Sequence, residues 1–332
     1  MYRLTRPLLF RLPAEFTHHL GINALRAYGL LARELRPLPG REVEVMGLRF
    51  ANPIGLAAGL DKNGDALRGL AALGFGFIEV GTVTPRPQPG NPKPRMFRYP
   101  SSEALINRLG FNNHGVAALV ERIARARGAL PTTQVGVNIG KNKDTPLPRA
   151  VDDYVFCLQA VYAVADYITL NLSSPNTPGL RELQGAKEIE VLLRAVIGAR
   201  DELAQRHHRR VPIAVKIAPD LSDSAIRELA AVLVAQGADA VIATNTTITR
   251  PPGLPEEAGG LSGKPLTELA VHAVDTLAGQ LAGRLPIIGV GGIDSAQTAH
   301  RFFNAGAELV QIYTGLIYKG PKLVRELVDR SQ

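Results

Sequence analysis

The chain of 332 residues has no tryptophan, one cysteine and three methionines. A single cysteine, Cys157, excludes an internal disulfide framework and any site built from several thiolates, such as an iron–sulfur cluster. The histidines show no HExxH or similar spacing, so no metal site is expected. Few aromatic residues, and no helix-turn-helix or RRM pattern, exclude the usual platforms for nucleic acid, which is not expected as a partner.

Long apolar runs are also missing. No run approaches the ~20 residues of a membrane span, and no signal-peptide core is seen, so a cytoplasmic protein is expected. The formal net charge is +8, which favours anionic partners. Residues 1–40 hold six arginines against two glutamates, a net charge of +4, and therefore half of the excess.

From residue 52 onward, short apolar runs alternate with helical patterns. Their near-continuous hydrophobicity is typical of parallel strands that are covered on both faces. Eight such units over about 280 residues predict an α/β fold, a closed (β/α)₈ TIM barrel over residues 41–332. Residues 1–40 form a short N-terminal helical extension. A doubly wound open sheet is the alternative, but no GxGxxG follows the first run. The runs cover residues 52–59, 75–83, 134–140, 167–173, 212–219, 238–245, 285–292 and 307–315.

Three segments lie outside this alternation. Residues 84–112 are expected to form a long βα loop, a kind of segment that usually carries function. Residues 41–50, "REVEVMGLRF", predict a hairpin that closes the bottom of the barrel. In the extension, an apolar stripe on a basic helix allows two interpretations, a helix packed against its own barrel or one that lies in a membrane interface. The stripe consists of Phe16, Leu20, Ala24, Ala27, Leu31 and Leu35.

The carboxyl ends of the predicted strands carry amides, hydroxyls, glycines and two lysines. Barrel enzymes place their active sites at this end. Paired carboxylates are absent from these positions, which argues against glycoside hydrolysis, and no metal ligand set is evident. Glycines 291, 292 and 315 end the last two strands, where barrels commonly bind a phosphate; turn glycines are the alternative.

Two lysines are candidates for chemistry. Lys216 lies inside the apolar strand "IAVKIAP", which favours an inward position. It fits either a Schiff base formed by a desolvated amine or a cation that stabilises negative charge on a cofactor ring. Lys62 follows "AAGLD" and is interpreted as a carboxylate or phosphate contact, with a surface lysine as the alternative.

The stretch "YITLNLSSPNTPGL" places Ser173 and Ser174 just after the fourth strand. A serine nucleophile would need a GxSxG elbow and a histidine partner, and neither is present. Asn138, Asn171 and Asn245 are expected around the same barrel mouth, where amides can orient a planar polar ligand. Ser174 is therefore either a turn residue or a base that removes a proton from a rigidly held substrate.

Several longer motifs carry a resemblance. "GLAAGLDKNG", "GTVTPRPQPGNPKPRMFR", "INRLGFNNHG", "LNLSSPNTPGLR", "VKIAPDL", "GVGGIDS" and "QIYTGLIYKGP" closely resemble the quinone-dependent (class 2) dihydroorotate dehydrogenases. The match covers the whole barrel. It implies an FMN-dependent oxidoreductase that converts (S)-dihydroorotate to orotate in de novo pyrimidine (UMP) biosynthesis, with a membrane quinone as electron acceptor.

The resemblance also assigns residues. It implies that Ser174 removes the C5 proton of the substrate while a hydride leaves C6 for N5 of FMN. The substrate contacts that it implies are Lys62, Asn107, Arg108, Leu109, Gly110, Phe111, Asn171, Asn176, Asn245 and Thr246. The FMN contacts that it implies are Ala58, Gly59, Leu60, Asp61, Lys62, Thr82, Asn138, Asn171, Lys216, Thr244, Gly263, Gly292, Tyr313 and Thr314.

The extension is similar to the same class and implies a quinone site and peripheral attachment to the cytoplasmic face of the cell membrane. His18, Arg98 and Tyr313 match the quinone-side polar groups, although the neighbouring His19 fits as well as His18. Residues 177–185 suggest a lid with hinges at Gly179 and Gly185.

Three other functions remain open. One is a Schiff-base lyase or aldolase that uses Lys216, and another is a non-catalytic protein associated with membranes. The third is a sister flavoenzyme that acts on uracil or tRNA dihydrouridine. "NLSSPNTPGL" and "INRLGFNN" favour the free carboxylated pyrimidine over this third function.

Overall fold

The barrel predicted from the apolar runs is confirmed. The computed structural model describes residues 2–32 and 35–331. Parallel strands form a closed barrel in the order β10-β12-β13-β3-β4-β7-β8-β9, which excludes the open sheet. Ile312 pairs with Leu56 where the last strand meets the first. The strands are β3 (Ile54–Leu56), β4 (Phe77–Val83), β7 (Gln134–Ile139), β8 (Tyr167–Asn171), β9 (Ile213–Ile217), β10 (Ala240–Ala243), β12 (Ile287–Val290) and β13 (Leu309–Ile312).

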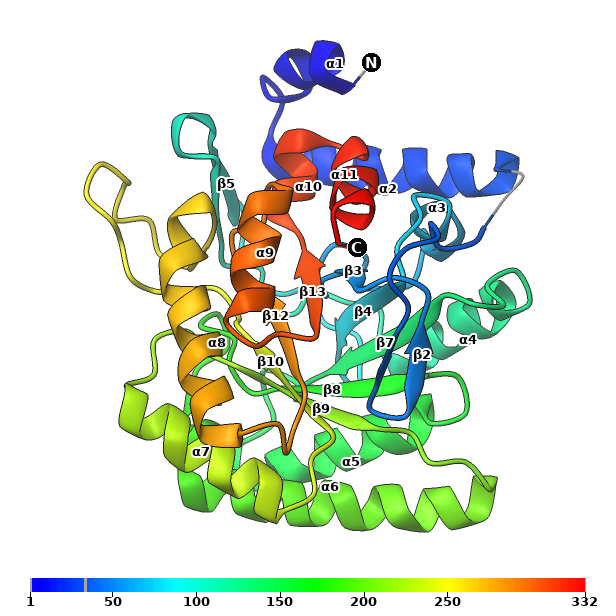
Figure 1. Ribbon diagram of the computed structural model, residues 1–332, viewed down its shortest axis with the longest axis vertical. Coiled ribbons are helices and arrows are strands. Elements are labelled where there is room, and N and C mark those ends of the chain that lie inside the picture. The colour runs from blue at the N-terminus through cyan, green and yellow to red at the C-terminus, as the bar shows by residue number, and fades with distance from the viewer. Residues whose placement is uncertain (1, 33–34, 332) are drawn as a thin grey trace.

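Helices surround the barrel (Figure 1). Helix α7 begins after Ser222, whose hydroxyl caps it by accepting a hydrogen bond from the Ala225 N–H at 3.2 Å. Two helices, α10 and α11, follow the last strand, β13. The helices that follow the strands are α3 (Leu67–Ala71), α4 (Val116–Arg127), α5 (Ala150–Val161), α6 (Ala186–His207), α7 (Asp223–Ala235), α8 (Thr267–Leu281), α9 (Ala296–Asn304), α10 (Thr314–Lys319) and α11 (Lys322–Asp329).

The barrel interior has its own apolar core, separate from the core between strands and helices. Two aromatic rings enter it from β4 and β8, and the neighbouring strands β3 and β7 carry a glycine paired with each. A Cβ at Gly55 would lie 2.2 Å from the Phe77 ring, and one at Gly136 would lie 2.1 Å from the Tyr167 ring. The predicted hairpin, β1 (Val43–Val45) with β2 (Leu48–Phe50), is confirmed and packs into this core.

Residues 84–112 connect β4 to α4, as expected for a long βα loop, but they contain strands of their own. The segment contains β5 (Met96–Tyr99) and β6 (Ala104–Asn107), which pair with β11 (Gly260–Gly263) in an antiparallel sheet. Gly260 pairs with Asn107 and Gly263 pairs with Ala104. This sheet brings Asn107 and Gly263, two residues far apart in the sequence, to the same side of the barrel mouth. Within the described residues, the 3₁₀ helices are Pro100–Ser102, Leu147–Arg149, η3 (Leu180–Gln184) and Lys264–Leu266.

The N-terminal extension forms two helices, α1 (Tyr2–Leu9) and α2 (Ala14–Leu31), which lie across the top of the molecule in Figure 1. Helix α2 contacts the barrel through the partly buried Ile22 and Leu25 and through Gly29, which is buried. The interpretation of a helix packed against its own barrel is therefore confirmed, although only part of the predicted stripe takes part. Leu20 and Ala24 line a cavity between the helix and the barrel, whereas Phe16 is 58% exposed and Leu31 is 81% exposed.

The charge of this segment falls partly outside the structure, because Arg33 and Glu34 are not among the described residues. Leu35, the last residue of the predicted stripe, follows this gap and is not part of α2. None of the described helices combines the length and the apolarity that a membrane crossing requires.

Candidate active site

A cavity opens at the carboxyl ends of the barrel strands. The space between its walls is about 930 Å³, counting the part that is open to solvent, which suits a small ligand. Most of the residues predicted for the substrate and the cofactor line this one cavity. They are Ala58, Gly59, Lys62, Thr82, Asn107, Leu109, Gly110, Phe111, Asn171, Ser174, Asn176, Lys216, Thr244, Asn245, Thr246, Gly263, Gly292, Tyr313 and Thr314.

Four predicted site residues do not line the cavity. The carboxylate of Asp61 accepts the N–H groups of Asp65 and Ala66 and so caps the turn before α3. Arg108 forms an ion pair with Glu257 and stacks on Phe97, which turns its side chain outward. The other two are Leu60, which lines a second cavity, and Asn138, which is fully buried behind Thr82.

Gln311 is the most informative lining residue that the sequence analysis missed. It lies two residues before Tyr313 in the last strand, and the two-residue period of a strand puts both side chains on the same face. The sequence therefore held a signal for Gln311 as a lining residue, namely a polar residue two positions before Tyr313. The cavity also includes Ala57, Ser262, Leu266, Val290, Gly291, Ile293 and Gly315.

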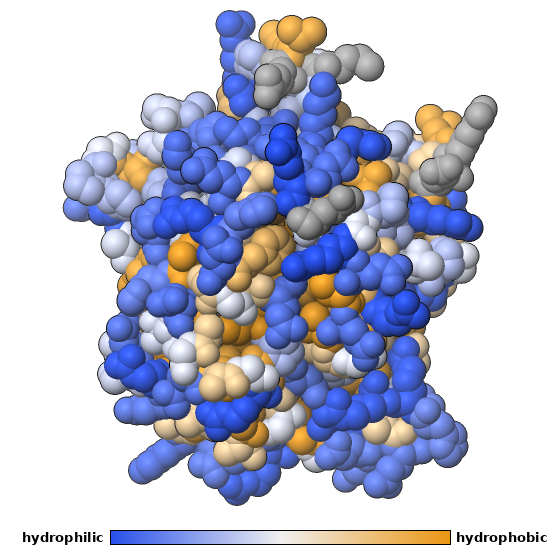
Figure 2. Space-filling model, in the orientation of Figure 1, coloured by the Kyte–Doolittle hydropathy of each residue, from blue (hydrophilic) through white to orange (hydrophobic). Residues whose placement is uncertain are grey.

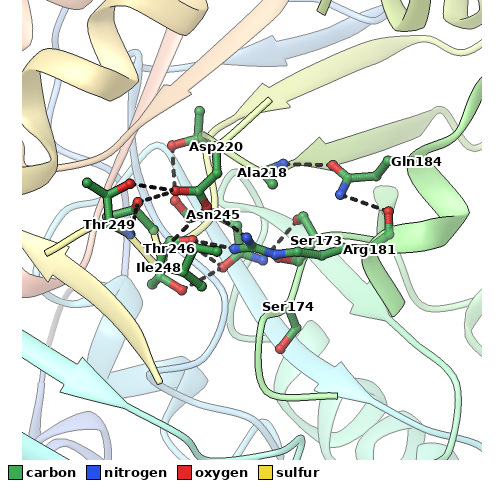
Figure 3. A network of polar contacts seen from close by, with 12 residues as sticks. Ser173, Ser174, Arg181, Gln184, Ala218, Asp220, Asn245, Thr246, Ile248 and Thr249 are labelled. Atoms are coloured by element: carbon green, nitrogen blue, oxygen red, sulfur yellow. Dashed lines mark hydrogen bonds and ion pairs between the residues drawn. The ribbon is translucent and has the colours of Figure 1, made fainter. Parts of the chain in front are cut away.

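The two serines after β8 have different roles. Ser173 is fully buried, donates to the Lys216 carbonyl at 2.7 Å and accepts from the Asn245 amide at 2.9 Å. Its hydroxyl is thus used in holding strands together. The Ser174 hydroxyl lines the cavity and accepts the Asn176 N–H at 3.3 Å. Figure 3 shows Ser174 pointing away from the contacts that hold Ser173. Of these two serines, only Ser174 has a hydroxyl that can reach a ligand in the cavity.

The segment expected as a lid is held by one arginine (Figure 3). Arg181, in η3, donates to the Ser173 carbonyl at 3.1 Å, to the Thr246 carbonyl at 3.0 Å and to the Asp220 carboxylate at 2.8 Å. Its charge pair with Asp220 is largely removed from solvent, with side chains 23% and 14% exposed. This single side chain connects η3 to the loops after β8, β9 and β10 and fixes the loop that carries Ser174.

A ring of amides surrounds Ser174. The Asn171 amide donates to the Thr82 hydroxyl at 2.8 Å, and the Asn245 amide donates to the Asn171 oxygen at 3.1 Å. Across the mouth, the Asn176 amide donates to the Asn107 oxygen at 3.2 Å. Amides held in this way present fixed donors and acceptors, which is the requirement for recognising a planar polar ring.

Both lysines of the cavity have lowered pKa values. Burial, followed by repulsion from Arg95, lowers the pKa of Lys62 to about 8. Burial also lowers the pKa of Lys216, against the attraction of Glu79. Lys62 donates to the Gly59 carbonyl at 2.8 Å. Both groups therefore gain from an anionic ligand that replaces the lost solvent.

The cavity fits the FMN that the resemblance implies. Gly59, Gly263, Gly291 and Gly292 line it with positive φ angles of 104°, 94°, 145° and 74°. A Cβ at Gly292 would lie 2.1 Å from the Thr267 hydroxyl, so only glycine fits there, and its backbone stays open to a ligand. The buried Gln311 Oε1 has no partner among the described residues and can accept an N–H from a ring. In the described part of the chain, no cluster of three or more His, Cys, Asp or Glu side chains is suited to a metal.

A second, apolar cavity lies between the N-terminal helices and the barrel. Its space is about 1760 Å³, again counting the part that is open to solvent. His18 and Arg98 line it, whereas Tyr313 lines the first cavity. His19 is 61% exposed and lies 3.9 Å from Glu15, so His18 is the histidine on the cavity wall. Burial lowers the pKa of His18 to about 3, so its imidazole is neutral.

The two cavities are neighbours. Leu60 and Leu316 line the apolar cavity, and the residues that directly precede them, Gly59 and Gly315, line the first. The remaining walls of the apolar cavity come largely from α1 and α2, including Leu9, Phe10, Ala14, Thr17, Leu20, Gly21, Ile22, Ala24, Leu25 and Tyr28.

Helix α2 is fixed near both of its ends. Glu15 forms a salt bridge with Arg95 at 2.7 Å, with side chains only 13% and 7% exposed. Near the other end, the backbones of α2 and α3 touch: a Cβ at Gly29 would lie 2.4 Å from the Gly69 nitrogen, and one at Gly69 would lie 1.9 Å from the Leu25 oxygen. These positions require glycine because no side chain fits between the helices.

Comparison with known proteins gives a consistent result. A family model described as dihydroorotate dehydrogenase matches residues 41–330. The chain is 58% identical to "Dihydroorotate dehydrogenase (quinone)" of Pseudomonas paraeruginosa over 99% of this chain and 97% of that protein. It is 57% identical to the protein of the same name in Azotobacter vinelandii, over 99% and 96%. The crystal structure of DHODH from Eimeria tenella in complex with ferulenol superimposes with a TM-score of 0.89 at 39% identity, covering 95% of this chain and 90% of that one.

Proposed function

Because this chain belongs to the dihydroorotate dehydrogenase family, as its motifs indicated, we propose that it oxidises (S)-dihydroorotate to orotate with FMN and a membrane quinone. The activity would serve de novo pyrimidine biosynthesis. One observation carries the proposal: the Ser174 hydroxyl lies in a cavity with a ring of amides, the buried Lys216 and the partly buried Lys62.

Ser174 acts as the base in this proposal. A free serine is a poor base, so the site must exclude water and align the hydroxyl with the C5–H bond of the substrate. Ser174 is only 6% exposed, and the Arg181 contacts hold its loop against three strand ends. The proton that leaves C5 passes to Oγ of Ser174, which at the same time releases its own hydroxyl proton to water or to a neighbouring hydroxyl. FMN, when bound, supplies N5 as the acceptor for the hydride that leaves C6.

The remaining polar residues hold the two ligands. Lys62 would pair with the substrate carboxylate, and Asn107, Asn171, Asn176 and Asn245 would bond the edge of its ring. The glycines of the cavity would leave room for FMN, with backbone N–H groups after β12 and β13 directed at its phosphate. Lys216 would stabilise negative charge on the reduced ring, a role for which its buried position inside the barrel suits it.

The apolar cavity is our candidate for the quinone site. It is lined mainly by hydrocarbon side chains, and His18 and Arg98 supply polar groups. The Arg98 guanidinium lies 4.6 Å from the Phe10 ring centre and donates to the Leu9 carbonyl at 3.4 Å. It thereby joins the barrel side of the cavity to α1. Residues adjacent in the sequence, such as Gly59 and Leu60, line the two cavities, so the cavities lie side by side. This proximity would give electrons a direct route from the flavin to the quinone.

The extension would lie on the cytoplasmic membrane surface. Leu4, Leu8 and Leu30 are 79%, 64% and 72% exposed, and Arg6 and Arg11 lie among the apolar side chains of this end. Figure 2 shows orange side chains at the top of the molecule, where α1 lies, beside hydrophilic ones. Exposed apolar groups mixed with basic ones are typical of helices that bind an interface peripherally.

A direct assay tests the function. The purified protein should be yellow and should oxidise dihydroorotate with a short-chain quinone, but not with fumarate or NAD. A colourless protein that borohydride traps on a keto substrate would instead favour the Schiff-base lyase that uses Lys216.

The pH dependence of orotate binding tests the role of Lys62. Its pKa in the free site is about 8, so the ammonium group is present below pH 8 and is lost above it. The dissociation constant of orotate should be constant from pH 6.5 to 7.5 and should then rise by up to about tenfold per pH unit above pH 8. Titration of the flavin absorbance measures it. Lys62→Met should bind orotate weakly with no such rise, and a flat profile in the unmodified protein would contradict the assignment.

A further inference from the structure

A buried carboxylate lies beneath the active site, and the proposed chemistry does not use it. Glu79, in the middle of β4, is fully buried inside the barrel. Its Oε1 accepts the Asn138 amide at 2.8 Å, and its Oε2 accepts the Tyr167 hydroxyl at 3.0 Å and the Gln311 amide at 2.8 Å. All three partners donate, which is the pattern of an ionised carboxylate, a group that only accepts.

From Glu79 a chain of hydrogen bonds runs to the substrate amides. Asn138, whose amide Glu79 holds, accepts the Thr82 hydroxyl at 2.5 Å. The Thr82 hydroxyl accepts the Asn171 amide at 2.8 Å, and the Asn171 oxygen accepts the Asn245 amide at 3.1 Å. Every bond in the chain points toward Glu79. The chain can end at Glu79 because a carboxylate accepts hydrogen bonds and donates none.

We propose that Glu79 is a positioning residue that sets which way the amides of the active site point. An asparagine side chain fits its site in two orientations that exchange oxygen and nitrogen, so its hydrogen-bond partners must choose one. Thr246 N–H, a donor, fixes the Asn245 oxygen at the far end at 2.8 Å. Glu79, an acceptor, fixes the near end. The inference depends on the proposed function, because it concerns the groups that would bind orotate.

An isosteric replacement shows why the charge matters. In Glu79→Gln, one of the two side-chain atoms becomes a donor. If that donor faces Asn138, the chain must reverse, and the backbone N–H of Thr246 cannot reverse with it. If it faces Gln311, that amide must turn over, and Gln311 lines the cavity. In either arrangement, a group that meets the ligands changes from acceptor to donor or loses its partner.

The test compares Glu79→Gln with Tyr167→Phe. Tyr167 contacts the same carboxylate from the same buried layer, but it is not part of the chain, so Tyr167→Phe is the matched control for packing. Orotate binding to the oxidised protein is titrated by flavin absorbance, together with flavin content and the unfolding temperature. We expect Glu79→Gln to weaken orotate binding by about tenfold, and Tyr167→Phe to change it by less than about twofold.

A double-mutant cycle with Asn138→Ala tests whether Glu79 acts through the chain. If it does, Glu79→Gln should cost little further affinity in the Asn138→Ala background, because the first link is already gone. If the losses of orotate affinity in the two single variants add fully in the double variant, the inference is wrong. It is also wrong if orotate affinity in Glu79→Gln stays within about twofold of the unmodified protein, or if the loss in Tyr167→Phe is equal. If the unmodified protein binds neither FMN nor orotate, the proposed function fails instead.

Discussion

Replacing Ser174 by alanine is expected to leave FMN and orotate bound but to slow reduction of the flavin by dihydroorotate by roughly 10²- to 10⁴-fold, the usual contribution of a positioned acid or base. The Ser174 hydroxyl accepts only a backbone N–H at 3.3 Å, so its loss disturbs little of the fold. Stopped-flow absorbance during anaerobic mixing with substrate measures the rate, and orotate titration measures binding.

Ser173→Ala is the matched control for this experiment. It removes the neighbouring hydroxyl, which bonds the Lys216 carbonyl and the Asn245 amide and does not line the cavity. We expect Ser173→Ala to lower stability and to slow flavin reduction far less than Ser174→Ala. If the flavin of Ser174→Ala is reduced at the normal rate, Ser174 is not the base. If Ser173→Ala slows flavin reduction more than Ser174→Ala does, Ser173 is the better candidate for the base.

Filling the apolar cavity is expected to slow only the second half of the proposed reaction, the reoxidation of the reduced flavin by quinone. Gly21 lines this cavity, and a Cβ added there meets nothing within 4 Å, so Gly21→Phe can enter the space without disturbing α2. Deletion of residues 1–36 removes the same wall entirely. With Gly21→Phe we expect the rate of flavin reoxidation by quinone to fall by about tenfold or more, the effect of a 1–3 kcal/mol steric penalty. With the deletion we expect it to be abolished.

The two half-reactions are measured separately in these variants. Reduction of the flavin by dihydroorotate should stay within about twofold of normal, because no residue of α1 or α2 lines the first cavity. Gly279→Phe is the control for Gly21→Phe, since it places the same ring in α8 at another position where a Cβ meets nothing within 4 Å. Equal loss of both half-reactions would contradict the division between the two cavities.

The barrel was predictable because parallel strands that are buried on both faces leave continuous apolar runs, and a run such as 212–219 is visible without knowledge of its neighbours. Some active-site residues, such as Asn171, followed from the same reading, since strand ends converge on one mouth, whereas others, such as Asn107, were assigned only by the resemblance. Lys216 was found by its charge in an apolar strand. Glu79 carries the same signal in "FGFIEVGTV", but its position in mid-strand gave no reason to connect it with a ligand.

The structural features that could not be predicted from the sequence depend on contacts between distant segments. The β5–β6–β11 sheet joins residues 96–107 to residues 260–263, and no local pattern reveals such a pairing. The docking face of α2 was predicted only in part, because hydrophobicity favoured the exposed Phe16 and Leu31, whereas the barrel contacts a face that includes Gly29. The different roles of Ser173 and Ser174 depend on which hydroxyl reaches the Lys216 carbonyl, a matter of tertiary geometry.

The way in which α2 is held determines how a long-tailed molecule can enter beneath it. Two contacts hold the helix in place, the ion pair of Glu15 with Arg95 and the backbone contact of Gly29 with Gly69. To swing outward, it would have to give up a shielded ion pair and separate two backbones in contact. Among the described side chains, no ion pair involves α1, which is held through hydrogen bonds from Tyr2 and Arg6 to the Ile317 and Tyr318 carbonyls. If the second cavity takes a quinone from a membrane, as proposed, displacement of α1 is the less costly way to open it.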